Sequence, residues 1–129
     1  GYKFHMNDIT AAMGLIGLKH ADAYMKQRKK IVDYYDKHLS VPTASGGSLW
    51  LYAIFVDDRD RVAELLKEAG IETNMIHLRN DIFKAFGGKR LPLPGMDAIE
   101  HRYLYIPLNT CMTLTDARYI VKTLNAIFA

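Results

Sequence analysis

The segment from Ser48 to Val56 constrains the fold of this 129-residue chain most, because it is apolar on both of its faces. Alternate side chains of a strand point to opposite faces of a sheet, so this pattern predicts a central strand that is covered on both sides. Residues 41–47, which precede it, are rich in Gly and Pro, and Asp57-Asp58 ends it. The chain is therefore expected to build a sheet with helices packed on it.

Apolar residues at helical spacing surround this strand. Predicted helices are residues 9–18 after the N-cap Asn7, 21–39, 59–69 ending at Gly70, a short turn at 96–101, and a final helix after Thr113 or Thr115. Further strands are predicted at residues 71–77 and 103–106. This order predicts an α/β (α+β) sandwich with a small three- or four-stranded sheet.

The length and composition predict one globular domain. Half of the residues are hydrophobic and 24% are charged, which is ordinary for a folded chain of this size. We therefore expect residues 1–129 to form a single domain, with an N-terminal helical segment over residues 1–40 and a small α/β domain over residues 48–129.

Charge and hydropathy argue against two kinds of partner. The formal net charge is +3, but the densest basic run, residues 26–30, is followed by Asp33 and Asp36, as on a solvated helix face. We therefore expect no nucleic-acid partner. No apolar stretch approaches ~20 residues, so we expect no membrane partner either.

Cysteine and histidine usage argues against disulfides and metal sites. Cys111 is the single cysteine, which leaves no intrachain disulfide and no zinc site made of cysteine pairs. The five histidines are scattered, without the spacing of metal ligands. The low cysteine count is typical of a reducing compartment, so we expect a cytoplasmic protein.

Polar side chains gather just before the first predicted helix. Tyr2, Lys3, His5 and Asn7 place donor and cationic groups at a helix N-terminus, an arrangement that suits a phosphate or carboxylate. The alternative is ordinary polarity of the protein surface.

A second polar cluster, His77-Leu78-Arg79-Asn80-Asp81, follows a predicted strand. Polar groups beyond strand ends are where α/β sheets bind ligands. The alternative is a polar loop that contains a local Asn-Asp turn.

The two clusters carry a resemblance to a known family. The opening residues, G-Y-K-F-H-M-N-D-I-T-A-A-M-G-L, resemble the block G-Y-[NK]-[YF]-x-[ML]-x-[DE]-[IL]-x-A-A-x-G-L of the DegT/DnrJ/EryC1/StrS family. These are sugar aminotransferases that use pyridoxal phosphate and have the fold type I architecture. Further segments resemble the family in the same order, at residues 18–35, 48–52, 61–73, 105–108 and 112–113.

The resemblance covers only the family's C-terminal third. It implies a C-terminal domain or fragment of an aminotransferase that acts on nucleotide-linked keto-sugars in polysaccharide biosynthesis, with glutamate as the usual amino donor. The family's Schiff-base lysine lies upstream of the opening block, and none of the ten lysines here matches it. We therefore expect no catalytic residue in these residues and no activity from the chain alone. The alternatives are a non-catalytic dimerisation or ligand-binding module derived from that domain, and an unrelated small α/β ligand-binding domain.

The resemblance also implies roles for both clusters. Lys3 and His5 match the loop that reaches across the homodimer to the partner's cofactor phosphate, so the chain is expected to form a homo-oligomer. His77, Arg79, Asn80 and Asp81 match the loop that lines the sugar-nucleotide end of the cleft. We expect Arg79 to contact substrate, and the alternative is a surface ion pair with Asp81.

Overall fold

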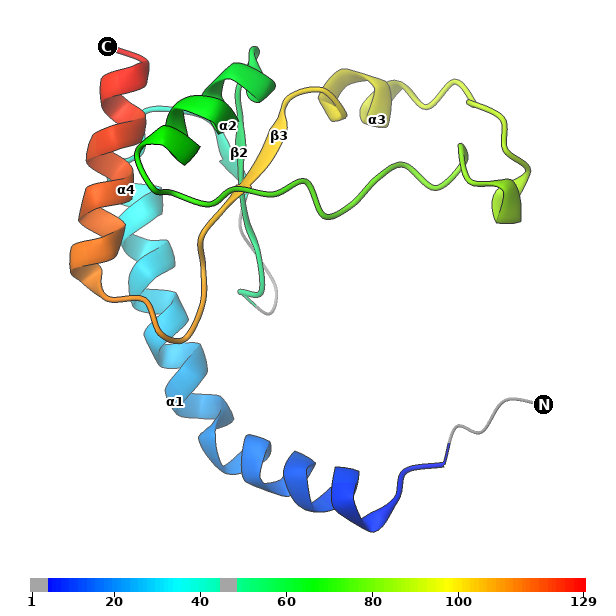
Figure 1. The fold of residues 1–129 in the computed structure, drawn as a ribbon, viewed down its shortest axis with the longest axis vertical. Helices are drawn as coiled ribbons and strands as arrows, with labels where there is room; N and C mark the ends of the chain where they lie inside the picture. The colour runs from blue at the N-terminus through cyan, green and yellow to red at the C-terminus, as the bar shows by residue number, and fades with distance from the viewer. Residues whose placement is uncertain (1–4, 45–48) are drawn as a thin grey trace.

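The structure is a computed structural model that describes residues 5–44 and 49–129. Its elements are α1 (Asp8–His38), β1 (Thr43–Ala44), β2 (Tyr52–Phe55), α2 (Arg59–Glu68), the 3-10 turn η1 (Lys84–Phe86), α3 (Pro94–Ile99), β3 (Tyr103–Ile106) and α4 (Leu114–Ile127) (Figure 1). The strands form one antiparallel sheet in the order β1-β2-β3. A small three-stranded sheet with helices confirms the predicted fold class.

The two helices predicted at residues 9–18 and 21–39 are one continuous helix, α1, of 31 residues. No breaker separates the two stretches, and isolated glycines such as Gly14 and Gly17 are tolerated inside a helix. Apart from the adjoining residues and the nearby backbone of α1 itself, no described atom lies within 4 Å of a Cβ built at either glycine, so neither marks a close approach of another segment. The predicted cap is confirmed: the Thr10 N–H donates to Asn7 Oδ1 at 2.9 Å.

Only the C-terminal half of α1 belongs to the core. Ile31, Val32 and Tyr35 are buried there, and α1 packs against α4. Figure 1 shows the N-terminal half extending away from the rest of the molecule. Its apolar residues, including Ile9 and Met13, are exposed.

Strand β2 is the central strand, as predicted, but the helices cover only one of its faces. Tyr52 and Ile54 point into the core formed with α1, α2 and α4. The other face carries Ala53 and Phe55, which pair in register with Tyr105 and Tyr103 of β3. The prediction of a strand covered on both faces holds for Tyr52, Ala53 and Ile54, which are buried, whereas the second face borders a pocket at Phe55, which is half-buried. Ser48, its predicted first residue, lies outside the described residues.

The prediction of a strand at residues 71–77 was wrong. Only Asn74 pairs with β3, in an isolated bridge in which its N–H and C=O bond to Tyr105 at 3.1 and 2.9 Å. The Asn74 side chain then accepts the next N–H, from Met75, at 2.7 Å. Local bonds of this kind compete with a ladder, which explains why the pairing ends there.

The predicted ends of α2 and α4 are confirmed. Gly70, at φ +73°, takes the left-handed conformation after α2. Thr113 caps α4 in a reciprocal box with Asp116, whose pKa is held below its usual value by the hydrogen bonds from Thr113. These helix ends could be predicted from the sequence because a cap depends only on residues within one helical turn.

Candidate functional site

A pocket of about 490 Å³ opens on the sheet face that the long helices leave uncovered. Aromatic rings of β2, β3 and the neighbouring segments form its walls, and the described residues that line it include no Lys, Arg, Asp or Glu. Among its lining residues are Trp50, Phe55, His77, Tyr103 and Tyr105. Its size and mostly apolar lining are those of a small-molecule site.

His77 lies at this pocket with its ring held in place. Its Nδ1 is hydrogen-bonded to the Tyr105 hydroxyl at 3.1 Å, and the Tyr103 hydroxyl donates to its carbonyl oxygen. Its ring also meets the ring of Tyr105 edge-on, with centroids 5.8 Å apart. Nε2 has no hydrogen-bond partner in the part of the chain that the structure describes. His77 therefore offers one oriented nitrogen to a ligand.

The Tyr105 hydroxyl adds a polar group to the pocket without a charge. Burial, together with the neighbouring Tyr103, raises the pKa of the Tyr105 hydroxyl. The hydroxyl is therefore protonated at neutral pH and supplies a polar group without a charge.

Trp50 completes the wall and was missed as a site residue by the sequence reasoning. It is 58% exposed, and its ring meets that of His77 edge-on, with centroids 5.9 Å apart and planes at 81°. The sequence places it in a strand-like run, where nothing distinguishes a core tryptophan from one at a pocket mouth.

Arg79 is buried rather than presented to the pocket. Its Nε and Nη2 donate to the two carboxylate oxygens of Asp81, both at 2.7 Å, and Nη2 also donates to the Leu91 carbonyl at 2.8 Å. Its Nη1 donates to Asp97 at 2.6 Å and to Glu100 at 3.3 Å. All five N–H groups of the guanidinium thus have protein acceptors.

This geometry favours the alternative interpretation of Arg79, an ion pair with Asp81, which is buried and not on the surface. Hydrogen bonds from Arg79, followed by that from the Leu91 N–H, hold the pKa of Asp81 well below its usual value. Asn80, between them, is exposed, and its side chain has no hydrogen-bond partner among residues 5–44 and 49–129. As substrate ligands, all of these residues stay predictions.

The described members of the predicted N-terminal cluster, His5 and Asn7, do not line the pocket. Tyr2 and Lys3 fall outside the described residues, and His5 is exposed just before α1. Figure 1 shows the start of α1 well away from the sheet. A helix N-terminus preceded by a histidine suits a phosphate group, although Asn7 already caps the Thr10 N–H and Asp8 adds a negative charge to this turn. The described residues beside them supply no wall for a cofactor ring, so a phosphate contact is all that they offer.

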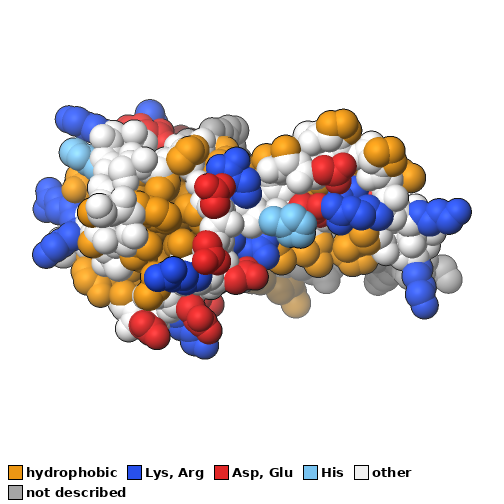
Figure 2. All heavy atoms as spheres, turned by 90° about the horizontal axis from the view of Figure 1, so that it is seen from above, with side chains coloured by type: hydrophobic (Ala, Val, Ile, Leu, Met, Phe, Trp, Pro, Cys, Tyr) orange, Lys and Arg blue, Asp and Glu red, His pale blue; other side chains and the backbone are white. Residues whose placement is uncertain are grey.

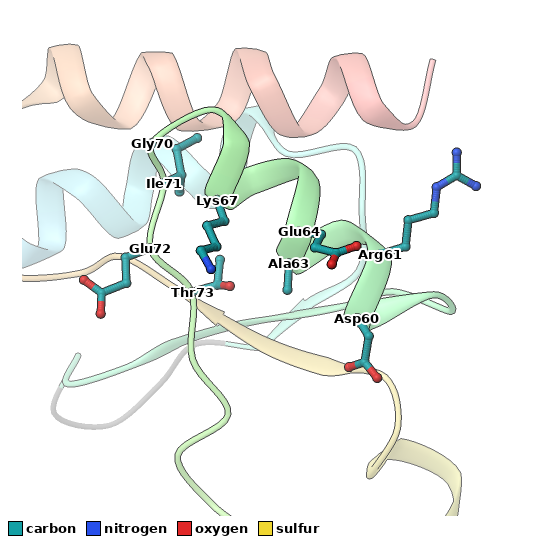
Figure 3. Close-up of a pocket in the computed structure, with 9 residues that line it drawn as sticks. All are labelled: Asp60, Arg61, Ala63, Glu64, Lys67, Gly70, Ile71, Glu72 and Thr73. Atoms are coloured by element: carbon teal, nitrogen blue, oxygen red, sulfur yellow. The ribbon is translucent and has the colours of Figure 1, made fainter.

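A larger hollow, of about 820 Å³, lies between α2 and residues 70–73. It is lined by both signs of charge, among them Arg61, Glu64, Lys67 and Glu72. Figure 3 shows that these charged ends point in different directions. They do not converge on one point as a ligand site requires, so this hollow is not the candidate site.

Two further features bear on possible partners. In the described ranges, no three His, Cys, Asp or Glu side chains are grouped to hold a metal ion, and no helix is both long and apolar enough to cross a membrane. On the face seen in Figure 2, acidic and basic side chains are intermixed, and hydrophobic side chains are exposed at both ends of the molecule.

Residues 1–125 match the DegT/DnrJ/EryC1/StrS aminotransferase family. The chain belongs to this family. The sugar aminotransferase CalS13 from Micromonospora echinospora is 30% identical, with a TM-score of 0.88 over 98% of this chain and 37% of CalS13. The match confirms the expected likeness to fold type I pyridoxal-phosphate enzymes.

Two other solved structures are similar to this chain. The PLP-form of the putative sugar aminotransferase Spr1654 from Streptococcus pneumoniae is 26% identical, with a TM-score of 0.85, and the match covers 98% of this chain and 37% of Spr1654. DesI, solved in the presence of its TDP-sugar product, is 23% identical, with a TM-score of 0.82, and the match covers 94% of this chain and 35% of DesI. The chain thus spans little more than a third of the length of these relatives.

Proposed function

We propose that this chain is the C-terminal domain of a pyridoxal-phosphate-dependent aminotransferase that acts on nucleotide-linked keto-sugars. The observation that carries the proposal is His77, which lies in an open aromatic pocket inside a chain that belongs to a family of aminotransferases. The sugar aminotransferase CalS13 and the TDP-sugar product of DesI support the substrate class.

Within the proposed enzyme, two residues of the loop from His77 to Asp81 contact the substrate and two stabilise the loop. His77, through Nε2, and the exposed Asn80 contact the substrate. Arg79 and Asp81 hold the loop in shape, because their hydrogen-bonding groups already face each other. Of the four residues predicted to bind substrate in this loop, His77 and Asn80 are therefore the two proposed to contact it.

Lys3 and His5 contribute to the phosphate site of pyridoxal phosphate in a partner subunit. When bound, this cofactor supplies the electron sink that amino-group transfer requires. The lysine that holds it covalently in the family lies outside these 129 residues, so the chain alone does not transaminate. The exposed apolar residues on the N-terminal half of α1 support a homo-oligomer.

Incubating the 129-residue chain with pyridoxal phosphate and borohydride tests whether the Schiff-base lysine lies outside this chain. We expect no stoichiometric adduct on a single lysine and no turnover. A polypeptide extended through the coding region upstream of Gly1 is expected to give both, with glutamate as donor. If the extended polypeptide gives neither, the non-catalytic binding module is the better description.

A further inference from the structure

We propose that Trp50 is the stacking surface for the base of the nucleotide-linked substrate, and that the pocket around it is the base-binding site. This inference rests on the proposed function and adds the part of the substrate that this chain recognises. Trp50 and His77 contribute rings that meet edge-on, and Trp50, which is 58% exposed, lines the pocket. Its indole is therefore open to a flat ring of a ligand.

The backbone around Trp50 is held in place from a distance. Arg28 Nη1, on α1, donates to the carbonyls of Leu49 and Trp50 at 2.9 and 3.2 Å. Leu49 has a φ of +52°, a left-handed conformation that is costly for a residue with a side chain. Such conformations persist only where surrounding contacts impose them, and they cluster at binding sites. Trp50 is therefore a positioned residue.

The side chains that line the pocket suit a base better than they suit the diphosphate or the hexose of a nucleotide sugar. A diphosphate is bound best by Arg and Lys, and the described lining residues include neither. A hexose presents several hydroxyls, but the polar side-chain groups here are the His77 ring, the Trp50 indole N–H and two tyrosine hydroxyls, one of which already donates to the His77 carbonyl. A base is an uncharged flat ring with a polar edge, which matches one stacking face and the free Nε2 of His77.

The sole tryptophan of the chain is Trp50, so its fluorescence reports on this pocket alone. We expect saturable quenching when the 129-residue chain is titrated with thymidine diphosphate or guanosine diphosphate. By calorimetry, Trp50→Ala should weaken binding of the quenching nucleotide about 5-fold or more, as expected for lost base stacking, whereas Trp50→Phe should retain most of it. Phe128→Ala, which removes an exposed aromatic ring elsewhere, should bind like the wild type.

Two further probes separate the parts of the substrate. Inorganic pyrophosphate and glucose 1-phosphate should leave the fluorescence unchanged. Quenching by either of them equal to that of the nucleotides, or no quenching by both nucleotides, overturns the assignment of a base.

Kinetics separate this inference from the proposed function. In an active complete enzyme, an unchanged KM for the nucleotide sugar in Trp50→Ala overturns the base site and leaves the aminotransferase standing. A complete enzyme that transaminates no nucleotide-linked keto-sugar overturns the proposed function, and with it this inference.

Discussion

Arg79 and Asp81 form a two-pronged ion pair within one loop, with both N–O distances at 2.7 Å. The same guanidinium reaches Asp97 and Glu100, so it ties the start of the 79–100 segment to its end. Because the pair is buried, removal of one partner leaves the other without compensation.

Arg79→Ala should loosen this segment and lower the Tm by several degrees, since Asp81 would lose its partner. Tryptic cleavage after Lys84 and Lys89, which lie between the tied ends, should become faster. Arg61→Ala, which removes an exposed arginine, serves as the control. Equal Tm values and equal cleavage rates in the two variants would contradict the structural role.

The same ion pair makes stability depend on pH on the acid side. The pKa of Asp81 and that of Asp97 lie below their usual value of 3.8, chiefly because Arg79 donates hydrogen bonds to them. A carboxylate with a lowered pKa adds stability above that usual value, and the stability is lost as the pH falls towards the lowered pKa. The Tm difference between wild type and Asp81→Asn should therefore shrink below about pH 4. A difference that stays constant from pH 7 to pH 2.5 would show that this carboxylate does not contribute.

The two helix caps should differ in their effect on global stability. Thr113→Ala should lower the free energy of unfolding by about 1 kcal/mol, because α4 packs in the core. Asn7→Ala removes the same kind of cap from the exposed end of α1 and should only fray that end locally. Urea unfolding of both variants measures the difference, and equal losses would mean that the N-terminal half of α1 is part of the cooperative unit.

Self-association should depend on the exposed side of α1. Ile9, Met13 and Ile16 are each more than half exposed, and chains usually cover apolar surface of this kind. Sedimentation should show dimers or larger species for the wild type and a shift towards monomer for Met13→Glu/Ile16→Glu. A wild-type chain that stays monomeric at high concentration would argue against the homo-oligomer.

The sequence predicted those features that depend on neighbours within one helical turn. Asn7, Thr113 and Gly70 mark helix ends through hydrogen bonds or backbone freedom at the residue itself, and all three are confirmed. The central strand was also predictable, because its apolar run is unusual for a surface segment.

Features that depend on distant residues were not predictable. From the sequence, Arg79 is expected to be an exposed cation in a polar loop. In the structure it is buried, with hydrogen bonds to Asp97 and Glu100, which are 18 and 21 residues away. Trp50 is exposed because the long helices cover only one face of β2, and strand periodicity does not reveal which face stays open.

Steady-state kinetics of the complete aminotransferase, with His77→Ala compared with the wild type, tests the central claim most directly. The pocket around His77 is proposed as the contribution of this chain to the substrate site. We expect kcat/KM for the nucleotide-linked keto-sugar to fall about tenfold, as for one lost hydrogen bond to substrate, with an unchanged Tm. A value of kcat/KM equal to that of the wild type would place the substrate elsewhere and contradict the claim.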